Sequence, residues 1–460
     1  MKGTNLKNGD QLTLEIKRLG INGEGIGYYQ KQVIFVKGAL PGEKVTALVT
    51  RPEMSYTEAE LQKIERPSSD RITPPCPVYE VCGGCQLQHL AYSAQLVFKQ
   101  DLIRQALEKY TKLDLRKVKI KETIGMDEPF RYRNKNQFQT RMNARGELES
   151  GLFQAGSHRL VPIDDCLVQE PQTVELTQTV TKALNILHIP AYHEKKGTGV
   201  IKTIVTRIGV QTGEMQLVFV TRTAEIPHLD ELLKIIQEKH PEIVSIMQNR
   251  QPEDTARIFG EETVLLWGKE TISEKLSEMT YDLSARAFFQ LNPTQTEKLY
   301  QEVKNALTLT GKEKIVDAYC GVGTIGLMLA PFAGEVRGMD TIPEAIEDAL
   351  RNAAKNQLDN VQYEVGDAKT VFQKWQQEGY EPDAVVVDPP RTGLDDELIR
   401  SLMQTKPKQL IYVSCNPSTL ARDLAVLDKR YRVRSIQPLD MFPQTAHTES
   451  VTILKRRNYK

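Results

Sequence analysis

Residues 1–66 alternate apolar and polar positions, a pattern that predicts short β-strands. The alternation is clearest in QLTLEIKRL, QVIFVKGAL and EKVTALVT, and glycines and a proline separate these runs as turns require. About five strands in about sixty residues favour a small β-barrel. Any other small β-domain would give the same pattern and is the alternative.

From about residue 294, strand and helix patterns alternate regularly. Apolar runs predict strands at KIVDAYC, EVRGMD, VQYEVGDA, DAVVVDPP and QLIYVSC. This order is typical of a doubly wound, mostly parallel sheet, which binds ligands at the carboxyl ends of its strands. Earlier in the chain, residues 92–110 are predicted to be helical. Residues 130–285 alternate short strand patterns with one clear helix near 228–239, and they predict no topology.

The composition narrows the class of protein. With 26% charged and 40% hydrophobic residues, the 460-residue chain is a normal globular one of about three domains. Lys and Arg balance Asp and Glu, 60 against 60, which excludes a bulk polycation but not an enzyme with a local basic surface. Neither a long apolar run nor a signal-peptide core occurs, so we expect a cytoplasmic protein without membrane contact and with reduced cysteines.

The string DAYCGVGTIG at 317–326 ends one predicted strand and opens a helix. Gly321 and Gly323 let the backbone approach a ligand, and the helix N-terminus adds a positive partial charge. Asp340 ends the next strand, where a carboxylate accepts hydrogen bonds from ribose hydroxyls. The pattern is typical of the S-adenosylmethionine loop of class I methyltransferases, with a dinucleotide-binding loop as the alternative. Asp367, after the third strand, either contacts the adenine or caps a helix.

The motif Asp388-Pro-Pro-Arg391 follows the apolar strand DAVVVD. Methyltransferases that act on amino groups have an aromatic residue after the two prolines, which stacks on the target base. Arg391 in that place argues against methylation of an exocyclic amine. Asp388 is then left to orient a base or the cofactor, and a structural turn is the alternative.

Two further residues suggest one particular reaction. Cys415 lies in SCNP, after the strand QLIYV and before a helix, whose N-terminus lowers a thiol pKa. Glu449 lies in HTES, before the last apolar strand. A thiolate that adds to C6 of a pyrimidine activates C5 for methylation, and a base must then remove the C5 proton. The alternatives are an inert cysteine and a solvated glutamate, and Cys320 is a rival nucleophile that its neighbours assign to the cofactor loop.

In this order, the motifs resemble those of the RNA uracil-5-methyltransferase family, specifically its iron–sulfur members that modify 23S ribosomal RNA. The resemblance covers nearly the whole chain and rests on FFQLNP (288–293), DAYCGVG (317–323), DPPR (388–391), SCNP (414–417) and HTES (447–450). It implies that residues 1–66 are a TRAM domain, an RNA-binding barrel, with Cys415 as nucleophile and Glu449 as base. It also implies four cofactor contacts: Gln290, Tyr319, Asp340 and Asp388. At the position of Asp340, many members of the family have Glu.

A further implication of the resemblance is a [4Fe–4S] cluster held by Cys76, Cys82, Cys85 and Cys166. Four thiolates are the usual ligand set of such a cluster. Spacing alone leaves zinc as a serious alternative, although the second CxxC pair of a zinc ribbon is missing. We expect the cluster to be structural or to contact RNA, rather than to take part in redox catalysis.

Residues 130–145 read FRYRNKNQFQTRMNAR and contain no acid. Cations for phosphates and rings for unstacked bases are what single-stranded RNA binding needs. The cations here are Arg131, Arg133, Lys135, Arg141 and Arg145, and the rings are Phe130, Tyr132 and Phe138. A second stretch, 429–460, has 8 Lys and Arg against 2 Asp and Glu. A solvated strand face is the alternative for both stretches.

The target base must reach Cys415, so it must be flipped out of any stack. Phe288 either stacks against this base or is a core aromatic beside Phe289. Arg391 is expected to lie close to the target nucleotide.

We therefore predict an α/β enzyme of three parts. A small TRAM-like β-barrel spans 1–66, a central α+β region with the cluster spans 67–98 and 132–284, and a class I Rossmann-like methyltransferase domain spans 99–131 and 285–460. The enzyme would transfer a methyl group from S-adenosylmethionine to C5 of a single-stranded or flipped-out uridine in 23S ribosomal RNA, through a Cys–C6 adduct. No obligate protein partner is predicted. A transfer-RNA uracil-5-methyltransferase and a non-enzymatic RNA-binding ribosome-assembly factor are the alternatives.

Overall fold

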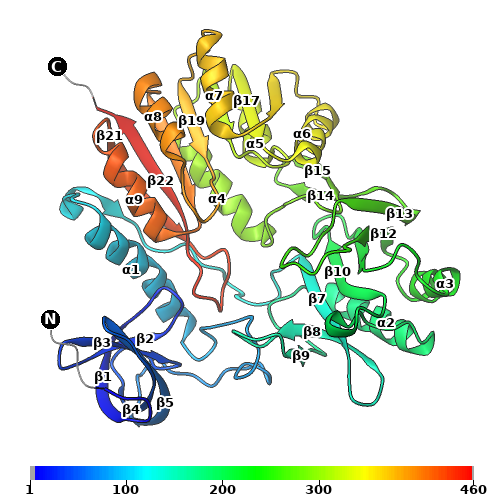
Figure 1. Cartoon of the computed structure of the whole chain (residues 1–460). Helices are drawn as coiled ribbons and strands as arrows, with labels where there is room; N and C mark the ends of the chain where they lie inside the picture. The colour runs from blue at the N-terminus through cyan, green and yellow to red at the C-terminus, as the bar shows by residue number, and fades with distance from the viewer. Residues whose placement is uncertain (1–5, 458–460) are drawn as a thin grey trace.

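The computed structural model describes residues 6–457, so the ends of the predicted first and last domains, 1–5 and 458–460, lie outside the described residues. Figure 1 shows a small barrel in blue, a second sheet in cyan and green, and a larger layered domain in yellow to red. None of the described helices is long and apolar enough to cross a membrane.

The N-terminal part is a closed five-stranded barrel with strand order β1-β2-β3-β5-β4. Its strands alternate buried and exposed side chains, and the buried set, which includes Leu14, Ile16, Ile34, Val36 and Val45, fills the barrel interior. This confirms the predicted small barrel. The strands are β1 (Gln11–Leu19), β2 (Gly25–Tyr29), β3 (Gln32–Lys37), β4 (Lys44–Pro52) and β5 (Tyr56–Arg66).

A seven-stranded sheet, here called the central sheet, has the order β13-β12-β11-β10-β7-β8-β9. Two helices, α2 (Pro171–Ile186) and α3 (Leu229–Lys239), pack their apolar faces on it. The strands are β7 (Lys135–Met142), β8 (Leu148–Phe153), β9 (Leu160–Pro162), β10 (Ile201–Ile208), β11 (Met215–Thr221), β12 (Ile243–Arg250) and β13 (Glu262–Gly268). The short helix η2 (Glu194–Lys196) completes this part, and the separate hairpin β14 (Thr271–Leu276) and β15 (Met279–Ser284) packs its buried side chains into the apolar cluster of the C-terminal domain.

Helix α2 does not follow from the strand-like pattern of residues 130–285. Its sequence, PQTVELTQTVTKALNI, is rich in Thr and Val, which are poor helix formers because their χ1 freedom is restricted. Tertiary contacts override that preference. Val180 and Leu184 are fully buried against the central sheet, and the Thr177 hydroxyl donates to the carbonyl of Thr173 within the helix at 2.8 Å.

The catalytic domain is built on an eight-stranded sheet of order β18-β17-β16-β19-β20-β22-β21-β6, in which β22 runs antiparallel to both neighbours. One apolar cluster covers each face: α1, α7, α8 and α9 contribute to one, and α4, α5 and α6 to the other. This confirms the doubly wound sheet. The strands are β6 (Lys119–Ile120), β16 (Lys314–Ala318), β17 (Glu335–Asp340), β18 (Val361–Val365), β19 (Ala384–Val387), β20 (Gln409–Ser414), β21 (Tyr431–Leu439) and β22 (Glu449–Arg456).

The helices of this domain alternate with its strands, as predicted. They are α4 (Pro293–Ala306), α5 (Thr324–Leu329), η3 (Ala330–Phe332), α6 (Pro343–Lys355), α7 (Ala368–Gln377), α8 (Asp396–Thr405) and α9 (Pro417–Leu427). One helix comes from much earlier in the chain: α1 (Tyr92–Tyr110) packs against α9 and β21, as Figure 1 shows. After the short helix η1 (Leu115–Lys117), β6 pairs with β21. The predicted domain boundary between residues 98 and 99 falls inside α1.

Candidate active site

The sheet topology brings three distant residues to one edge. Asp388 follows β19 and Cys415 follows β20, and these strands are parallel, so their carboxyl ends meet. Glu449 begins β22, which runs antiparallel to β20 with Ser414 opposite Ser450. Its first residue therefore lies at the same edge. The arrangement is the one that the motifs predict for ligand binding.

Cys415 immediately precedes the N-terminus of α9. The Asn416 side chain caps that helix by accepting a hydrogen bond from the Ser418 amide at 3.0 Å. The side-chain amide of Asn416 also donates a hydrogen bond to the Arg391 carbonyl at 2.9 Å. The loops after β19 and β20 are thereby tied together, and Arg391 and Cys415 face one pocket.

This active-site pocket has a volume of about 350 Å³, within the range of small-molecule sites. Its walls come from six separate parts of the chain. The turn between β1 and β2 and the segment before α1 contribute residues that sequence reasoning does not single out. The pocket is lined by Ile21, Asn22, Gln86, Leu102, Arg391, Cys415, Asn416, Pro417, Ala446, His447 and Thr448.

The electrostatics of the pocket disfavour a free thiolate. Burial, with the charges of Glu449 and Asp388, raises the pKa of Cys415 to about 12, and Arg391 opposes this. These effects outweigh the lowering that a helix N-terminus predicts. Burial also raises the pKa of Asp388 to about 7 and, with the Asp388 charge, raises the pKa of Glu449 well above its usual value. The site therefore favours a bound cation.

Arg391 shares the pocket mouth with His447. The Arg391 guanidinium lies 3.3 Å from the His447 Nε2 atom. Burial and the Arg391 charge lower the pKa of His447 to about 4, so its imidazole is neutral at physiological pH. A signal for His447 was present in the sequence, because it is the first residue of the HTES motif, but no role was predicted for it.

The loop after β16 has an unusual backbone. Tyr319, Gly321 and Gly323 have φ angles of 65°, 54° and 81°, a left-handed conformation that glycine adopts easily and tyrosine does not. Both Asp340 carboxylate oxygens brace the turn, because they accept hydrogen bonds at 3.0 Å from the amides of Gly321 and Ile342. A Cβ added at Gly321 would meet no atom within 4 Å. The loop is therefore rigid and opens toward free space.

Three other predicted residues lie around this loop. Asp367 accepts a hydrogen bond from the Thr370 amide at 3.0 Å and caps α7, which is one of its two predicted roles. Gln290 is half-buried, and its backbone carbonyl accepts a hydrogen bond from the Asn134 side chain at 3.3 Å. Phe288 is 61% exposed whereas Phe289 is 3% exposed, so the alternative of Phe288 as a core aromatic is wrong.

Comparisons with known proteins identify the chain. A model of the tRNA (uracil-5-)-methyltransferase family matches residues 258–457, and a TRAM model matches residues 5–61. RNA methyltransferases of Listeria innocua and Enterococcus faecalis are 59% and 54% identical, each over 98% of this chain and 99% of theirs. The chain belongs to the RNA uracil-5-methyltransferase family. This confirms the predicted family, its TRAM domain and the enzyme class.

A solved structure of this family has the same fold. The Pyrococcus abyssi tRNA (uracil-54, C5)-methyltransferase, in complex with S-adenosyl-L-homocysteine, superposes with a TM-score of 0.77 at 31% identity. The match covers 96% of this uracil-5-methyltransferase and 99% of the Pyrococcus chain. The three-part α/β architecture is thus the family fold, as the motifs predict.

Part of the predicted RNA-binding stretch is not available for RNA in this methyltransferase. Tyr132 and Phe138 are 3% and 0% exposed, so they are core residues and cannot stack on bases. Arg131 makes two hydrogen bonds of 2.6 Å to the Asp165 carboxylate. The charge of Arg131 is therefore paired with an acid from outside the stretch.

The remaining cations of the stretch have different surroundings. The Arg133 guanidinium lies 5.9 Å from the centre of the Phe442 ring. Lys135 is half-buried, and burial with the charges of Arg207 and Arg133 lowers its pKa to about 7. Arg141 is exposed.

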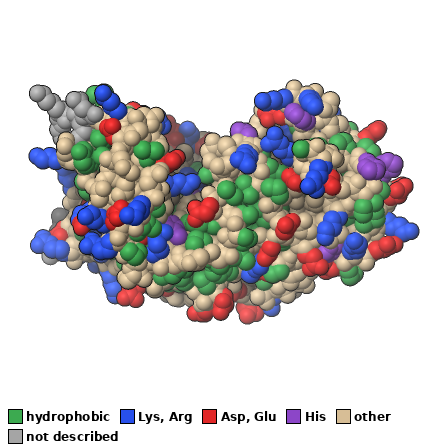
Figure 2. All heavy atoms as spheres, turned by 90° about the horizontal axis from the view of Figure 1, so that it is seen from below, with side chains coloured by type: hydrophobic (Ala, Val, Ile, Leu, Met, Phe, Trp, Pro, Cys, Tyr) green, Lys and Arg blue, Asp and Glu red, His purple; other side chains and the backbone are tan. Residues whose placement is uncertain are grey.

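The C-terminal basic stretch does not face the pocket. Arg432 and Lys455 are paired at the far end of β21 and β22, whereas Glu449 begins β22 at the pocket. Lys460 lies outside the described residues. On the face with the barrel and the central sheet, Figure 2 shows basic and acidic side chains interspersed rather than in one basic patch.

Cys76, Cys82, Cys85 and Cys166 line one common cavity of about 30 Å³, here called the cysteine cavity. All are free thiols, and the Gly84 amide donates a hydrogen bond to the Cys82 sulfur at 3.3 Å. Within residues 6–457, no three Cys, His, Asp or Glu side chains converge closely enough to hold a single metal ion. The four thiols thus surround a space instead of meeting at a point.

Proposed function

We propose that this enzyme transfers a methyl group from S-adenosylmethionine to C5 of a uridine in 23S ribosomal RNA. The observation that carries the proposal is the meeting of a thiol, Cys415, and a buried carboxylate, Glu449, at one edge of the sheet, where the Glu449 charge acts on the thiol. A pyrimidine C5 needs both groups, because a nucleophile must activate it and a base must release the product.

The chemistry assigns each residue one step. Cys415 loses its proton and its sulfur adds to C6, which gives C5 the character of an enolate carbon. S-adenosylmethionine supplies the methyl group from a cationic sulfur. Glu449 then removes the C5 proton, the C5–C6 double bond re-forms, and the thiolate leaves. Burial of Glu449 supports this role, because a carboxylate with a raised pKa is a stronger base once it is ionised.

The loop after β16 suits the methyl donor. Its left-handed backbone at Gly321 borders open space, and each Asp340 oxygen has a second lone pair for a ribose hydroxyl. Asp388, with its raised pKa, is stabilised in its charged form by a cationic ligand. We propose that the donor is held by Gln290, Tyr319, Gly321, Gly323, Asp340 and Asp388.

For the RNA we propose contacts from Arg391, which lines the pocket, and from other exposed or half-buried residues. Phe288 offers an exposed ring for the flipped base. Arg133, Lys135, Arg141 and Arg391 offer positive charge to phosphates. Lys135 takes up a proton when a phosphate approaches, because its pKa of about 7 rises beside an anion.

We propose that the four cysteines of this cavity hold a [4Fe–4S] cluster. In such a cluster each thiolate binds a different iron, and the cavity is lined by four thiols. Zinc, which also binds four thiolates, is the alternative. Amide donors such as that of Gly84 stabilise the sulfur charge.

A second candidate substrate is transfer RNA, because the Pyrococcus abyssi structure of the same fold is a tRNA (uracil-54, C5)-methyltransferase. Ribosomal RNA is favoured here because the chain resembles the iron–sulfur members that act on it. A non-enzymatic assembly factor is disfavoured, since the thiol, the base and the donor loop are all intact.

The test is a Glu449→Gln variant incubated with donor and with unmodified 23S ribosomal RNA or transfer RNA. Without the base the last step stalls, so a protein–RNA adduct that survives a denaturing gel should accumulate on ribosomal RNA. Glu347→Gln, which changes an exposed carboxylate on α6, is the matched control and should give none. An adduct on transfer RNA alone would support the second candidate, and no adduct on either RNA would contradict the mechanism.

A further inference from the structure

The loop that leads into Glu449, residues 440–448, is irregular and yet buried. Met441, Gln444, Thr445 and Ala446 are each less than 5% exposed. Buried backbone N–H and C=O groups need partners, and a loop without secondary structure must find them on other elements. The contacts of this loop therefore decide where its last residue, and Glu449 after it, is held.

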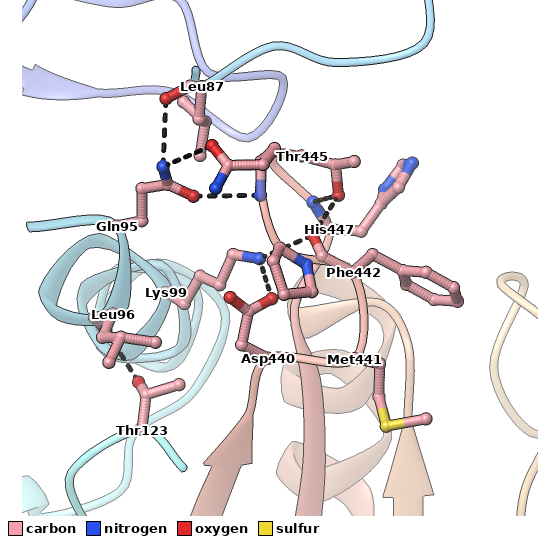
Figure 3. A network of polar contacts seen from close by, with 12 residues as sticks. Leu87, Gln95, Leu96, Lys99, Thr123, Asp440, Met441, Phe442, Thr445 and His447 are labelled. Atoms are coloured by element: carbon pink, nitrogen blue, oxygen red, sulfur yellow. Dashed lines mark hydrogen bonds and ion pairs between the residues drawn. The ribbon is translucent and has the colours of Figure 1, made fainter. Parts of the chain in front are cut away.

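Helix α1 provides the first set of contacts, as Figure 3 shows. The Lys99 ammonium contacts the Asp440 carboxylate and donates to the Phe442 carbonyl at 3.1 Å. One turn earlier, the Gln95 side chain accepts from the Gln444 amide at 3.0 Å and donates to the Gln444 side chain at 3.0 Å. Both side chains point from the helix toward the loop.

Other elements hold the same loop from further sides. Each supplies a hydrogen-bond donor to a loop carbonyl at between 2.9 and 3.0 Å. The donors are the amides of Gln86 and Leu87 to Gln444, the hydroxyl of Tyr132 to Pro443, and the side chain of Asn292 to Met441. The side-chain amide of Gln95 also donates to the Leu87 carbonyl at 3.1 Å. Helix α1 therefore ties the segment at Leu87 to the 440–448 loop.

The Lys99–Asp440 pair is a poor device for stability alone. Both side chains are 0% exposed, and removing two charges from water opposes folding about as much as their attraction favours it. Replacement of such a pair by apolar residues is often neutral or stabilising. The pair does, however, fix geometry, because its ammonium reaches the side chain at the start of the loop and a carbonyl two residues later.

We propose that Lys99 and Gln95 are positioning residues, which hold the 440–448 loop so that Glu449 meets the C5 proton. This inference rests on the proposed function. Cys415 lies on a different loop, secured by the Asn416 cap and its bond to Arg391. Loosening the 440–448 loop should therefore slow removal of the proton while leaving addition and methyl transfer largely intact.

The test compares Lys99→Met with the double variant Lys99→Met/Asp440→Leu, using the full chain, donor and unmodified 23S ribosomal RNA. Two quantities are measured: the fraction of enzyme in a gel-stable RNA adduct, and Tm. Lys99→Met should accumulate several-fold more adduct than wild type and lose Tm, because it leaves a buried carboxylate unpaired. The double variant should recover Tm and keep the adduct.

A matched control separates positioning from general destabilisation. Asn249 is a buried amide in the central sheet that donates to Gly260, Glu262 and Thr263 at 2.8–3.1 Å. Asn249→Leu should lower Tm without adduct. Gln95→Leu, which breaks the second contact, should behave like Lys99→Met and carries the test if Lys99→Met does not fold.

Two results would overturn the inference in different ways. If the double variant recovers the wild-type Tm and no longer accumulates adduct, Lys99 has a structural role only. If Glu449→Gln forms adduct but neither the Lys99 variants nor Gln95→Leu do so, the inference fails while the proposed function stands. Absence of adduct in Glu449→Gln as well would refute the proposed function and the inference with it.

Discussion

Cys415 and Cys85 lie in environments that share one property and differ in all others. Both thiols are half-buried, and burial raises the pKa of each to about 12. Around Cys415 the next influences are the carboxylates of Glu449 and Asp388, opposed by Arg391. Around Cys85 the other charges that raise its pKa are those of other cysteines.

This comparison indicates that the residues around a thiol, rather than its pKa, distinguish a nucleophile from a metal ligand. The Cys415 pocket is open and lined by the cation Arg391, and the charge of Glu449 acts on the thiol, which suits the proposed nucleophile. The cysteine cavity is smaller and offers mostly sulfur and apolar walls, as a cluster needs. A thiol pKa raised by burial is therefore compatible with both proposed roles, the nucleophile Cys415 and the metal ligand Cys85.

The largest effect should come from Cys415→Ala, which removes the attacking sulfur. Methyl transfer to unmodified 23S ribosomal RNA should fall by about 10⁴-fold or more, the usual effect of losing a covalent nucleophile. RNA binding, measured by filter retention, should be unchanged. Cys320→Ala is the matched control: its thiol is buried in the donor loop, and most methyl transfer should remain. Activity that survives in Cys415→Ala but is lost in Cys320→Ala would reverse the assignment of the nucleophile.

The sequence predicts the barrel, the sheet and the pocket edge because each has a local signal. Alternation over two residues marks the β-strands of the barrel, and the strand–helix order places Asp388, Cys415 and Glu449 at strand ends. An antiparallel last strand then completes the site. Nothing more than the connection order is needed to bring these residues together.

Other features depend on contacts that no local pattern encodes. Lys99 and Asp440 are 341 residues apart in the chain, and a lysine on a helix is usually solvated. In contrast, the burial of Tyr132 and Phe138 had a signal. Together with Asn134 and Asn136, they form an every-second-residue set that faces the interior along β7 and the residues before it. The basic residues between them concealed that alternation.

A second prediction concerns pH and isolates the first chemical step. In Glu449→Gln the base cannot titrate, so the rate of adduct formation reports the Cys415 thiolate. Burial still raises the pKa of the Cys415 thiol in this variant, although the Glu449 charge is gone, so the thiolate fraction should grow with pH, by up to about tenfold per unit between pH 6 and 9. Single-turnover gels at saturating donor and RNA measure this rate. A rate that stays flat over this range would mean that the thiol is already ionised in the complex, against the prediction.

The smallest effect on methyl transfer should come from Cys85→Ser, which breaks the other cysteine site. Iron and acid-labile sulfide, measured after anaerobic purification, should be lost, and Tm should fall because cluster binding contributes to folding. Methyl transfer below the new Tm should drop by less than about tenfold, or about 1.4 kcal/mol, since the cysteine cavity supplies no reacting group. Cys415→Ala should keep its full iron content. One zinc per chain and no iron in the wild type would contradict the iron–sulfur cluster. If Cys85→Ser lost as much methyl transfer as Cys415→Ala, the separation of a metal site from a catalytic site would be contradicted.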